Sequence, residues 1–167
     1  MLLHWWLAAR PLWVDEEMLL LNVRDRGWGQ LAGALWLDQS APLGWLVLEK
    51  LALVTLGPGE RAARLLPTLF GIGTLAGALW IGRRWMSAFG AAVLASLCAS
   101  SEWLIFFTKE LKHYSADACG ALWLPALAAW AADDDLPAIR RWRVSIWWAI
   151  AAGSLWFSNG ALFVTPG

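Results

Sequence analysis

Two short polar clusters interrupt a largely apolar sequence, and each contains residue types that could take part in catalysis or binding. The first is the acidic run Asp15, Glu16 and Glu17, which follows an apolar N-terminal stretch. A carboxylate can raise the proton affinity of its neighbour, so a pair of this kind can do acid–base chemistry. Acidic residues in a first helical turn also cap the helix and favour its dipole. The spacing alone favours this structural interpretation and leaves the catalytic one open.

The second cluster lies between two apolar stretches and combines cations, acids and hydroxyl groups. Ammonium groups and the free N–H groups of a helix start attract anions, so Lys112 and His113 could hold a phosphate group. In the structural interpretation, Ser115 caps a helix, Asp117 lies in its first turn and the lysines contact lipid head groups. Local chemistry leaves both interpretations open. The cluster consists of Lys109, Glu110, Lys112, His113, Tyr114, Ser115 and Asp117.

Glu102 is a third candidate because it lies inside an apolar stretch. An acid at membrane depth is costly and is by default functional or paired, and Lys109, two turns further on, could pair with it. Cys98 and Cys119 lie in apolar surroundings and behave as small apolar residues. The sequence has no Cys/His spacing typical of a metal site.

The composition indicates a membrane protein. Hydrophobic residues make up 59% of the chain and charged residues 16%, against about 45–50% and about 25% in soluble domains. The mean hydropathy is +0.52, and the 15 tryptophans are typical of chains that contact membrane interfaces. The formal net charge is zero and no polybasic run is present, which excludes nucleic-acid binding as a function class.

Apolar segments of sufficient length predict an all-α, multi-pass transmembrane helical bundle. A span needs about 20 apolar residues, and we expect transmembrane helices at 62–82, 86–107 and 144–164, with a shorter fourth at 116–132 that contains Pro125. Residues 1–14 are expected to be the end of a first span or an interfacial anchor. Residues 15–61 are predicted to be a non-spanning loop with two short helices, because Glu49 and Lys50 interrupt its longest apolar run.

The order of these spans predicts which loops share a membrane face. Counting crossings places residues 10–61 and 108–115 on one side, so Asp15, Glu16 and Asp117 are expected on a common face. Arginines concentrate in the two short connections at 83–84 and 140–143, which predicts that those connections are cytoplasmic. The acidic face, with its juxtamembrane helical loop, is then extracytoplasmic.

Several strings, in this order, carry a resemblance to a known family. They are Arg10-Pro-Leu-Trp-Val-Asp15-Glu16-Glu17, Gln39-Ser-Ala-Pro42-Leu-Gly-Trp-Leu, Leu56-Gly-Pro-Gly-Glu60-Arg-Ala-Ala-Arg64-Leu-Leu-Pro67, Lys109-Glu110-Leu-Lys112-His-Tyr114-Ser115-Ala-Asp117 and Trp156-Phe-Ser158-Asn-Gly-Ala-Leu-Phe163. The chain resembles the N-terminal third of the glycosyltransferase family 39 and arabinosyltransferase-like membrane proteins. These belong to the wider GT-C fold, which also includes the protein O-mannosyltransferases. Asn159 and Ala161 depart from the family pattern.

The resemblance implies a transferase that moves a sugar from a polyprenyl-phosphate carrier to a hydroxyl group of a lipid, protein or glycan acceptor. It implies that Asp15 is the general base with Glu16 beside it, and that Asp117 helps to bind acceptor or a divalent metal. No other cofactor is expected. Lys112 and His113 are predicted from their chemistry to hold the carrier phosphate, with Glu110 and Tyr114 in the same binding group. A single in-line displacement would invert the anomeric centre.

Other function classes stay open at this point. The chain could be a non-catalytic multi-pass membrane protein, either a transporter component or a partner-binding subunit, or a degenerate remnant of the transferase. Transporters usually place polar groups at mid-membrane, whereas the polar groups here gather near one face, which favours the enzyme. We expect the chain to be an N-terminal fragment that could be inactive alone, from a bacterial plasma membrane.

Overall fold

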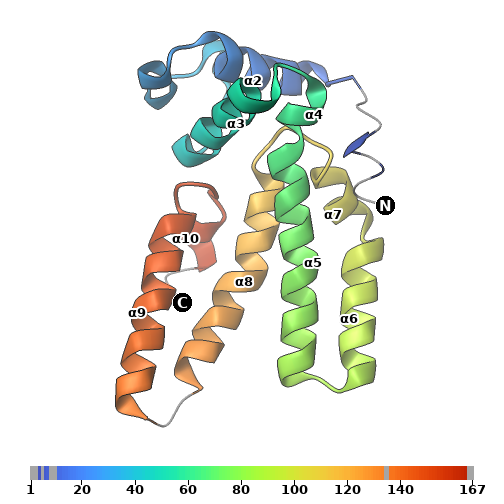
Figure 1. Cartoon of the computed structure of the whole chain (residues 1–167), viewed down its shortest axis with the longest axis vertical. Coiled ribbons are helices and arrows are strands. Elements are labelled where there is room, and N and C mark those ends of the chain that lie inside the picture. The colour runs from blue at the N-terminus through green and yellow to red at the C-terminus, as the bar shows by residue number, and fades with distance from the viewer. Residues whose placement is uncertain (1–3, 5, 8–10, 134–135, 165–167) are drawn as a thin grey trace.

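The structure is a computed structural model that describes residues 4, 6–7, 11–133 and 136–164. Every regular element in these ranges is a helix, so the predicted all-α class is confirmed. Helices α2 to α4 form a layer that lies across one end of a set of upright helices, α5 to α9 (Figure 1). Half of the predicted end of a first span, 1–14, lies outside the described residues.

The layer across the end, residues 14–63, is called the cap below. It contains α2 (Val14–Asp25), the 3-10 helices η1 (Trp28–Ala32) and η2 (Trp36–Asp38), α3 (Leu43–Leu56) and α4 (Glu60–Ala63). The two longest of these helices, α2 and α3, lie almost entirely within the segment 15–61, where the sequence predicts two short helices. A small core joins α2, η1, α3 and α4, built around Leu19, Val23, Leu46 and Leu111. Leu111 belongs to the loop before α8, so the cap and the upright helices share this core.

The upright helices are α5 (Leu65–Trp85), α6 (Ala88–Ser100), α7 (Glu102–Phe107), α8 (Tyr114–Ala132) and α9 (Pro137–Ser154), followed by the short α10 (Ala161–Val164). Helix α5 runs away from the cap and packs against α6 and α8, and α8 packs against α9 (Figure 1). Glycines permit close packing on α5. A Cβ at Gly82 would lie 2.7 Å from Ala91 Cα, and one at Gly77 would lie 2.8 Å from Trp123 Nε1.

The prediction of one continuous helix over 86–107 is wrong. The helix is interrupted at Ser101. Helix α6 ends at Ser100, and α7 begins as a separate helix at Glu102. The Ser101 hydroxyl accepts a hydrogen bond from Leu104 N at 3.4 Å, which caps the new helix. A serine stabilises a helix start and is tolerated in a helix interior, and the apolar pattern does not distinguish the two positions.

The prediction of a helix over 144–164 is also wrong in its bounds. Helix α9 starts at Pro137, a residue type favoured in a first turn, and ends at Ser154. Residues 155–160 then turn before α10. Asp117 of α8 holds this turn, since its Oδ1 accepts hydrogen bonds from Ser158 Oγ at 2.6 Å and Gly160 N at 3.0 Å. The turn that ends the helix thus depends on a contact between Ser158 and Asp117, which are 41 residues apart. A local sequence pattern does not reveal such a contact.

One helical segment in the described part of the chain, Glu60–Trp85, is long and apolar enough by length and composition to cross a membrane. Helix α6 is apolar but shorter, with 13 residues. The predicted spans at 62–82 and 116–132 correspond closely to α5 and α8, and Pro125 lies inside α8 as the sequence requires. One helix thus agrees with the prediction of a membrane protein. The predicted bundle of four spans stays a prediction.

Candidate functional site

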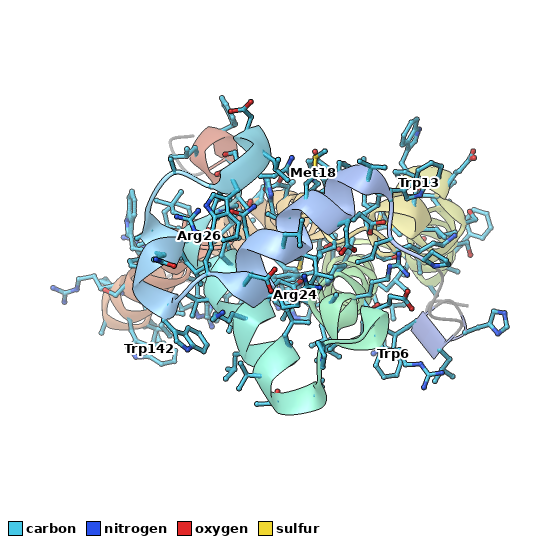
Figure 2. All side chains as sticks on the ribbon, turned by 90° about the horizontal axis from the view of Figure 1, so that it is seen from above. Trp6, Trp13, Met18, Arg24, Arg26 and Trp142 are labelled. Carbon is cyan, nitrogen blue, oxygen red and sulfur yellow. The ribbon has the colours of Figure 1, made fainter. Side chains whose placement is uncertain are left out.

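The two polar clusters of the sequence meet where the cap lies on the upright helices. The cap and the loop between α7 and α8 lie at the same end of the molecule, and the end of α5, the start of α6, the end of α8 and the start of α9 lie at the other (Figure 1). Seen along the upright helices, α2 crosses this end with Trp13 at one side and Arg24 and Arg26 toward the other (Figure 2). This arrangement brings Asp15 and Glu16 to the loop that carries Lys112 and His113.

Glu16 joins the two segments. Its side chain is fully buried at 0% exposure, and Oε1 accepts a hydrogen bond of 2.7 Å from Leu111 N in the loop before α8. Oε2 accepts one of 2.8 Å from Trp13 N and one of 3.4 Å from the buried Arg64 guanidinium. Both oxygens of this buried carboxylate accept hydrogen bonds from protein donors, so Glu16 holds the junction together rather than contacting substrate.

Asp15 is the opposite case, because its side chain is 57% exposed. Its Oδ2 lies 3.6 Å from Lys112 Nζ, and the same ammonium donates a hydrogen bond of 2.7 Å to Gln39 Oε1. Lys112 itself is buried against the cap. The site therefore presents a water-accessible carboxylate beside a positioned ammonium group, built from three segments far apart in the sequence.

His113 and Asp117 form the other half of the site. His113 Nε2 lies 3.7 Å from Asp117 Oδ2 and 3.1 Å from Asn159 Nδ2. Burial lowers the pKa of His113 below its ordinary value of 6.5; the charge of Asp117 opposes this shift and that of Lys112 adds to it. The ring is therefore neutral at pH 7. With the Asn159 amide donating to Nε2, the ring proton sits on Nδ1.

The remaining predicted binding residues take different positions. Glu110 is buried in the loop before α8, whereas Tyr114 is exposed at the start of that helix. The Tyr114 ring lies 5.3 Å from the rings of both His113 and Phe107, measured between centroids. Glu102, in the first turn of α7, is exposed and lies outside this cluster.

Comparison with protein-family models, with curated proteins and with solved structures found no match for this chain. The resemblance to glycosyltransferase family 39 therefore stays a prediction from short strings. The geometry of the site has to carry any functional proposal.

The structure adds residues that the sequence did not single out as site residues. Arg64 completes the Glu16 junction, Gln39 positions Lys112, and Ser158, Asn159 and Gly160 hold Asp117 and His113. The role of Arg64 could have been predicted, because a cation near the start of an apolar stretch is expected to have a buried partner. The others lie in permissive strings, and only the folded contacts reveal them.

The site does not fit a divalent metal. Among the residues that the structure describes, no group of three or more His, Cys, Asp or Glu side chains could hold a metal ion. Asp117 already accepts two hydrogen bonds at Oδ1, and its Oδ2 lies 3.7 Å from Nε2 of the His113 ring. Chemically, the arrangement can accept a proton at Asp15 and bind an anion through Lys112. His113 Nδ1 is buried and has no hydrogen-bond partner among the described residues.

Proposed function

We propose that this chain is part of a multi-pass membrane glycosyltransferase that moves a sugar from a polyprenyl-phosphate carrier to an acceptor hydroxyl on the extracytoplasmic side. The observation that carries this proposal is the pairing of the exposed Asp15 carboxylate with the positioned Lys112 ammonium at 3.6 Å. The pair lies at the end of an apolar helix bundle, where a lipid phosphate and a water-soluble acceptor could meet.

The reaction needs one base and one anion site. Asp15 takes the proton of the acceptor hydroxyl as the oxygen attacks the anomeric carbon from the face opposite the carrier. The bond from that carbon to the phosphate oxygen breaks, and the departing phosphate keeps the electron pair. Lys112 offsets the charge that develops on it. One displacement of this kind inverts the anomeric configuration.

The proposed membrane arrangement rests on the length of the upright helices and on exposed tryptophans. Helix α5 has 21 residues, which at about 1.5 Å per residue spans the ~30 Å bilayer core. Trp85 and Trp142 are exposed near the far end, and Trp13 and Trp103 are exposed near the cap. Indole rings at both ends of a bundle are typical of the two bilayer interfaces. In this proposal α5, α6 with α7, α8 and α9 cross the membrane.

The orientation follows from the arginines at the far end. Arg83 and Arg84 end α5, and Arg140, Arg141 and Arg143 occupy the first turns of α9. Positive charge in short connections favours the cytoplasmic side, which puts the cap and the site outside a bacterial plasma membrane.

A partner-binding subunit without catalytic activity is the second candidate. Glu16 and Asp117 are both committed to hydrogen bonds within the chain, as acids in a purely structural junction would be. Under this alternative, Asp15 would bind a basic group of a partner and no sugar would leave the carrier.

The decisive experiment compares Asp15→Asn with Asp25→Asn in the full-length protein. Both residues lie on α2 and both are exposed, but Asp25 pairs with Arg24 away from the site. Membranes holding each variant are incubated with a panel of radiolabelled polyprenyl-phosphate sugars, and loss of label from the lipid is measured. We expect D15N to lower transfer by about 10²- to 10⁴-fold, the usual contribution of a general base, and D25N to match wild type.

Wild-type turnover by D15N, with normal insertion, would refute the base assignment. Failure of every labelled carrier to lose its sugar with the wild-type protein would favour the subunit. Circular dichroism of each purified variant checks that the fold is retained.

A further inference from the structure

The break between α6 and α7 has a structural consequence. A straight helix over 86–107 would continue to pack against α5, but the turn at Ser101 starts a new helix axis. A cavity of about 480 Å³ lies at this level, between α5, the end of α6, α7 and the start of α8. Its volume falls within the range of about 300–1,000 Å³ seen for ligand sites.

The walls of this cavity are mostly apolar, and two of its polar residues flank the loop of the site. The apolar lining includes Ile72, Leu75, Leu104, Ile105 and Phe107. Thr108 and Ser115 also line it, and they bound the loop that carries Lys112 and His113. Apolar walls that continue to a cationic loop match a molecule with a long apolar chain and an anionic end.

Ser115 adds a second observation. Its side chain is 2% exposed, and Oγ has no hydrogen-bond partner among the described residues. An unsatisfied buried hydroxyl costs free energy, so such a group is expected to meet a ligand or a water molecule. At this end of the cavity, the hydroxyl could donate a hydrogen bond to an ester oxygen.

We infer that this cavity holds the carbon chain of the polyprenyl-phosphate carrier next to its phosphate, with Ser115 and Lys112 at the phosphate end. The inference rests on the proposed function and names the chain-binding part of the same site. A lipid phosphate matches the mostly apolar lining together with the Lys112 ammonium, which lies in the loop between the lining residues Thr108 and Ser115.

The first test maps contacts directly. The 167-residue chain is placed in phosphatidylglycerol nanodiscs with a polyprenyl phosphate that carries a diazirine in its first isoprene units. After irradiation, mass spectrometry locates the adducts. We expect adducts on α7, the start of α8 and the facing part of α5. Adducts spread over the lipid-exposed surfaces of α6 and α9 would overturn the inference.

Competition decides between possible ligands. Unlabelled polyprenyl phosphate should abolish the adducts, whereas inorganic phosphate and additional phosphatidylglycerol should leave them unchanged. Equal competition by phosphatidylglycerol would make the cavity a general lipid site and overturn the assignment to the carrier.

Filling the cavity gives an independent measurement. Ala99→Phe and Ala118→Phe place a ring in its lining, and we expect at least about tenfold weaker photolabelling, equivalent to ~1.4 kcal/mol. Ala92→Phe is the matched control, because Ala92 lies two turns earlier on α6, is exposed and does not line the cavity. Unchanged labelling of folded A99F and A118F would contradict the inference, and adduct mapping on the wild-type chain decides if neither variant folds.

The outcomes also separate the two proposals. Carrier bound in the cavity without sugar release by the full-length protein would leave the cavity assignment intact and refute the transferase. Sugar release that depends on Asp15, with adducts outside the cavity, would support the transferase and refute the cavity assignment.

Discussion

Glu16 and Glu49 are both fully buried at 0% exposure in the cap, yet their surroundings differ. Glu16 accepts hydrogen bonds from two backbone N–H groups and from Arg64. Both oxygens of Glu49, on α3, lack a hydrogen-bond partner within the described part of the chain. Burial raises the pKa of Glu49 well above its ordinary value of 4.5, because it disfavours the charged form of the carboxyl group.

The comparison shows that the Glu16 carboxylate connects separate segments of the chain, whereas the Glu49 carboxyl group is buried without a hydrogen-bond partner among the described residues. The Glu16 region ties α2 to the loop before α8 and thereby places Asp15 next to Lys112. The Glu49 region contributes no such tie, and its neighbour Lys50 is satisfied separately by the carbonyl oxygens of Val23 and Arg26 at 2.8 and 2.7 Å. Removing the first acid should therefore cost stability and site geometry, and removing the second should stabilise the fold.

The largest effect is expected for Glu16→Ala. This change leaves Arg64 buried with its carboxylate partner removed and frees Leu111 N, and breaking a buried pair typically costs about 3–5 kcal/mol. The free energy of unfolding in detergent, measured by denaturant titration, should fall by that amount. Glu17→Ala is the control, because Glu17 is exposed on the next position of α2 and should change stability by less than about 0.5 kcal/mol. Equal stabilities of the two variants would contradict the junction.

The meeting of Asp15 with the 108–115 loop could be predicted from the sequence because it depends on counting apolar segments. Each segment of sufficient length reverses the side of the next loop, and small errors in helix bounds do not alter that count. The bonding of Glu16 could not be predicted in this way. Asp15 and Glu16 are adjacent acids with similar propensities, and only the packing of α2 decides which one is buried.

The misplaced helix ends have a related physical cause. Ser101 starts α7 through its own hydroxyl, and the 155–160 turn is held by Asp117 from α8. Both depend on hydrogen bonds that compete with an apolar pattern which by itself is compatible with a continuous helix. The same limit applies to Asn159, whose contact with His113 crosses 46 positions of the sequence.

A smaller effect of opposite sign is expected for Glu49→Leu. Replacing a buried carboxyl group that has no hydrogen-bond partner removes a desolvation cost of about 1–3 kcal/mol. The free energy of unfolding should rise, in contrast to the fall for E16A. A decrease would indicate that the carboxyl group has a stabilising role in the cap and would erase the contrast between the two regions.

The pH dependence of the Glu49 variants sharpens this prediction. The pKa of Glu49 is higher in the folded chain than the ordinary value of 4.5 that applies when it is unfolded. Its contribution to stability is therefore complete below pH 4.5 and is lost as pH rises toward the folded-state pKa. Glu49→Gln cannot ionise, so thermal unfolding should show a decline over this window in wild type that is absent in E49Q. Parallel pH profiles would refute a buried neutral Glu49.

The smallest effect concerns the contact between the exposed Asn159 and the buried His113. Asn159→Ala removes one hydrogen bond between partly buried neutral groups, and we expect a loss of about 0.5–1.5 kcal/mol. The informative readout is the pKa of His113, followed by NMR in a His4→Gln background. Burial keeps that pKa below 6.5 in wild type, and N159A should raise it because the amide stabilises the ring with Nε2 unprotonated. Asn159→Asp should raise it further, since a second carboxylate would join Asp117 beside the ring. An unchanged pKa in both variants would show that Asn159 does not set the protonation of His113.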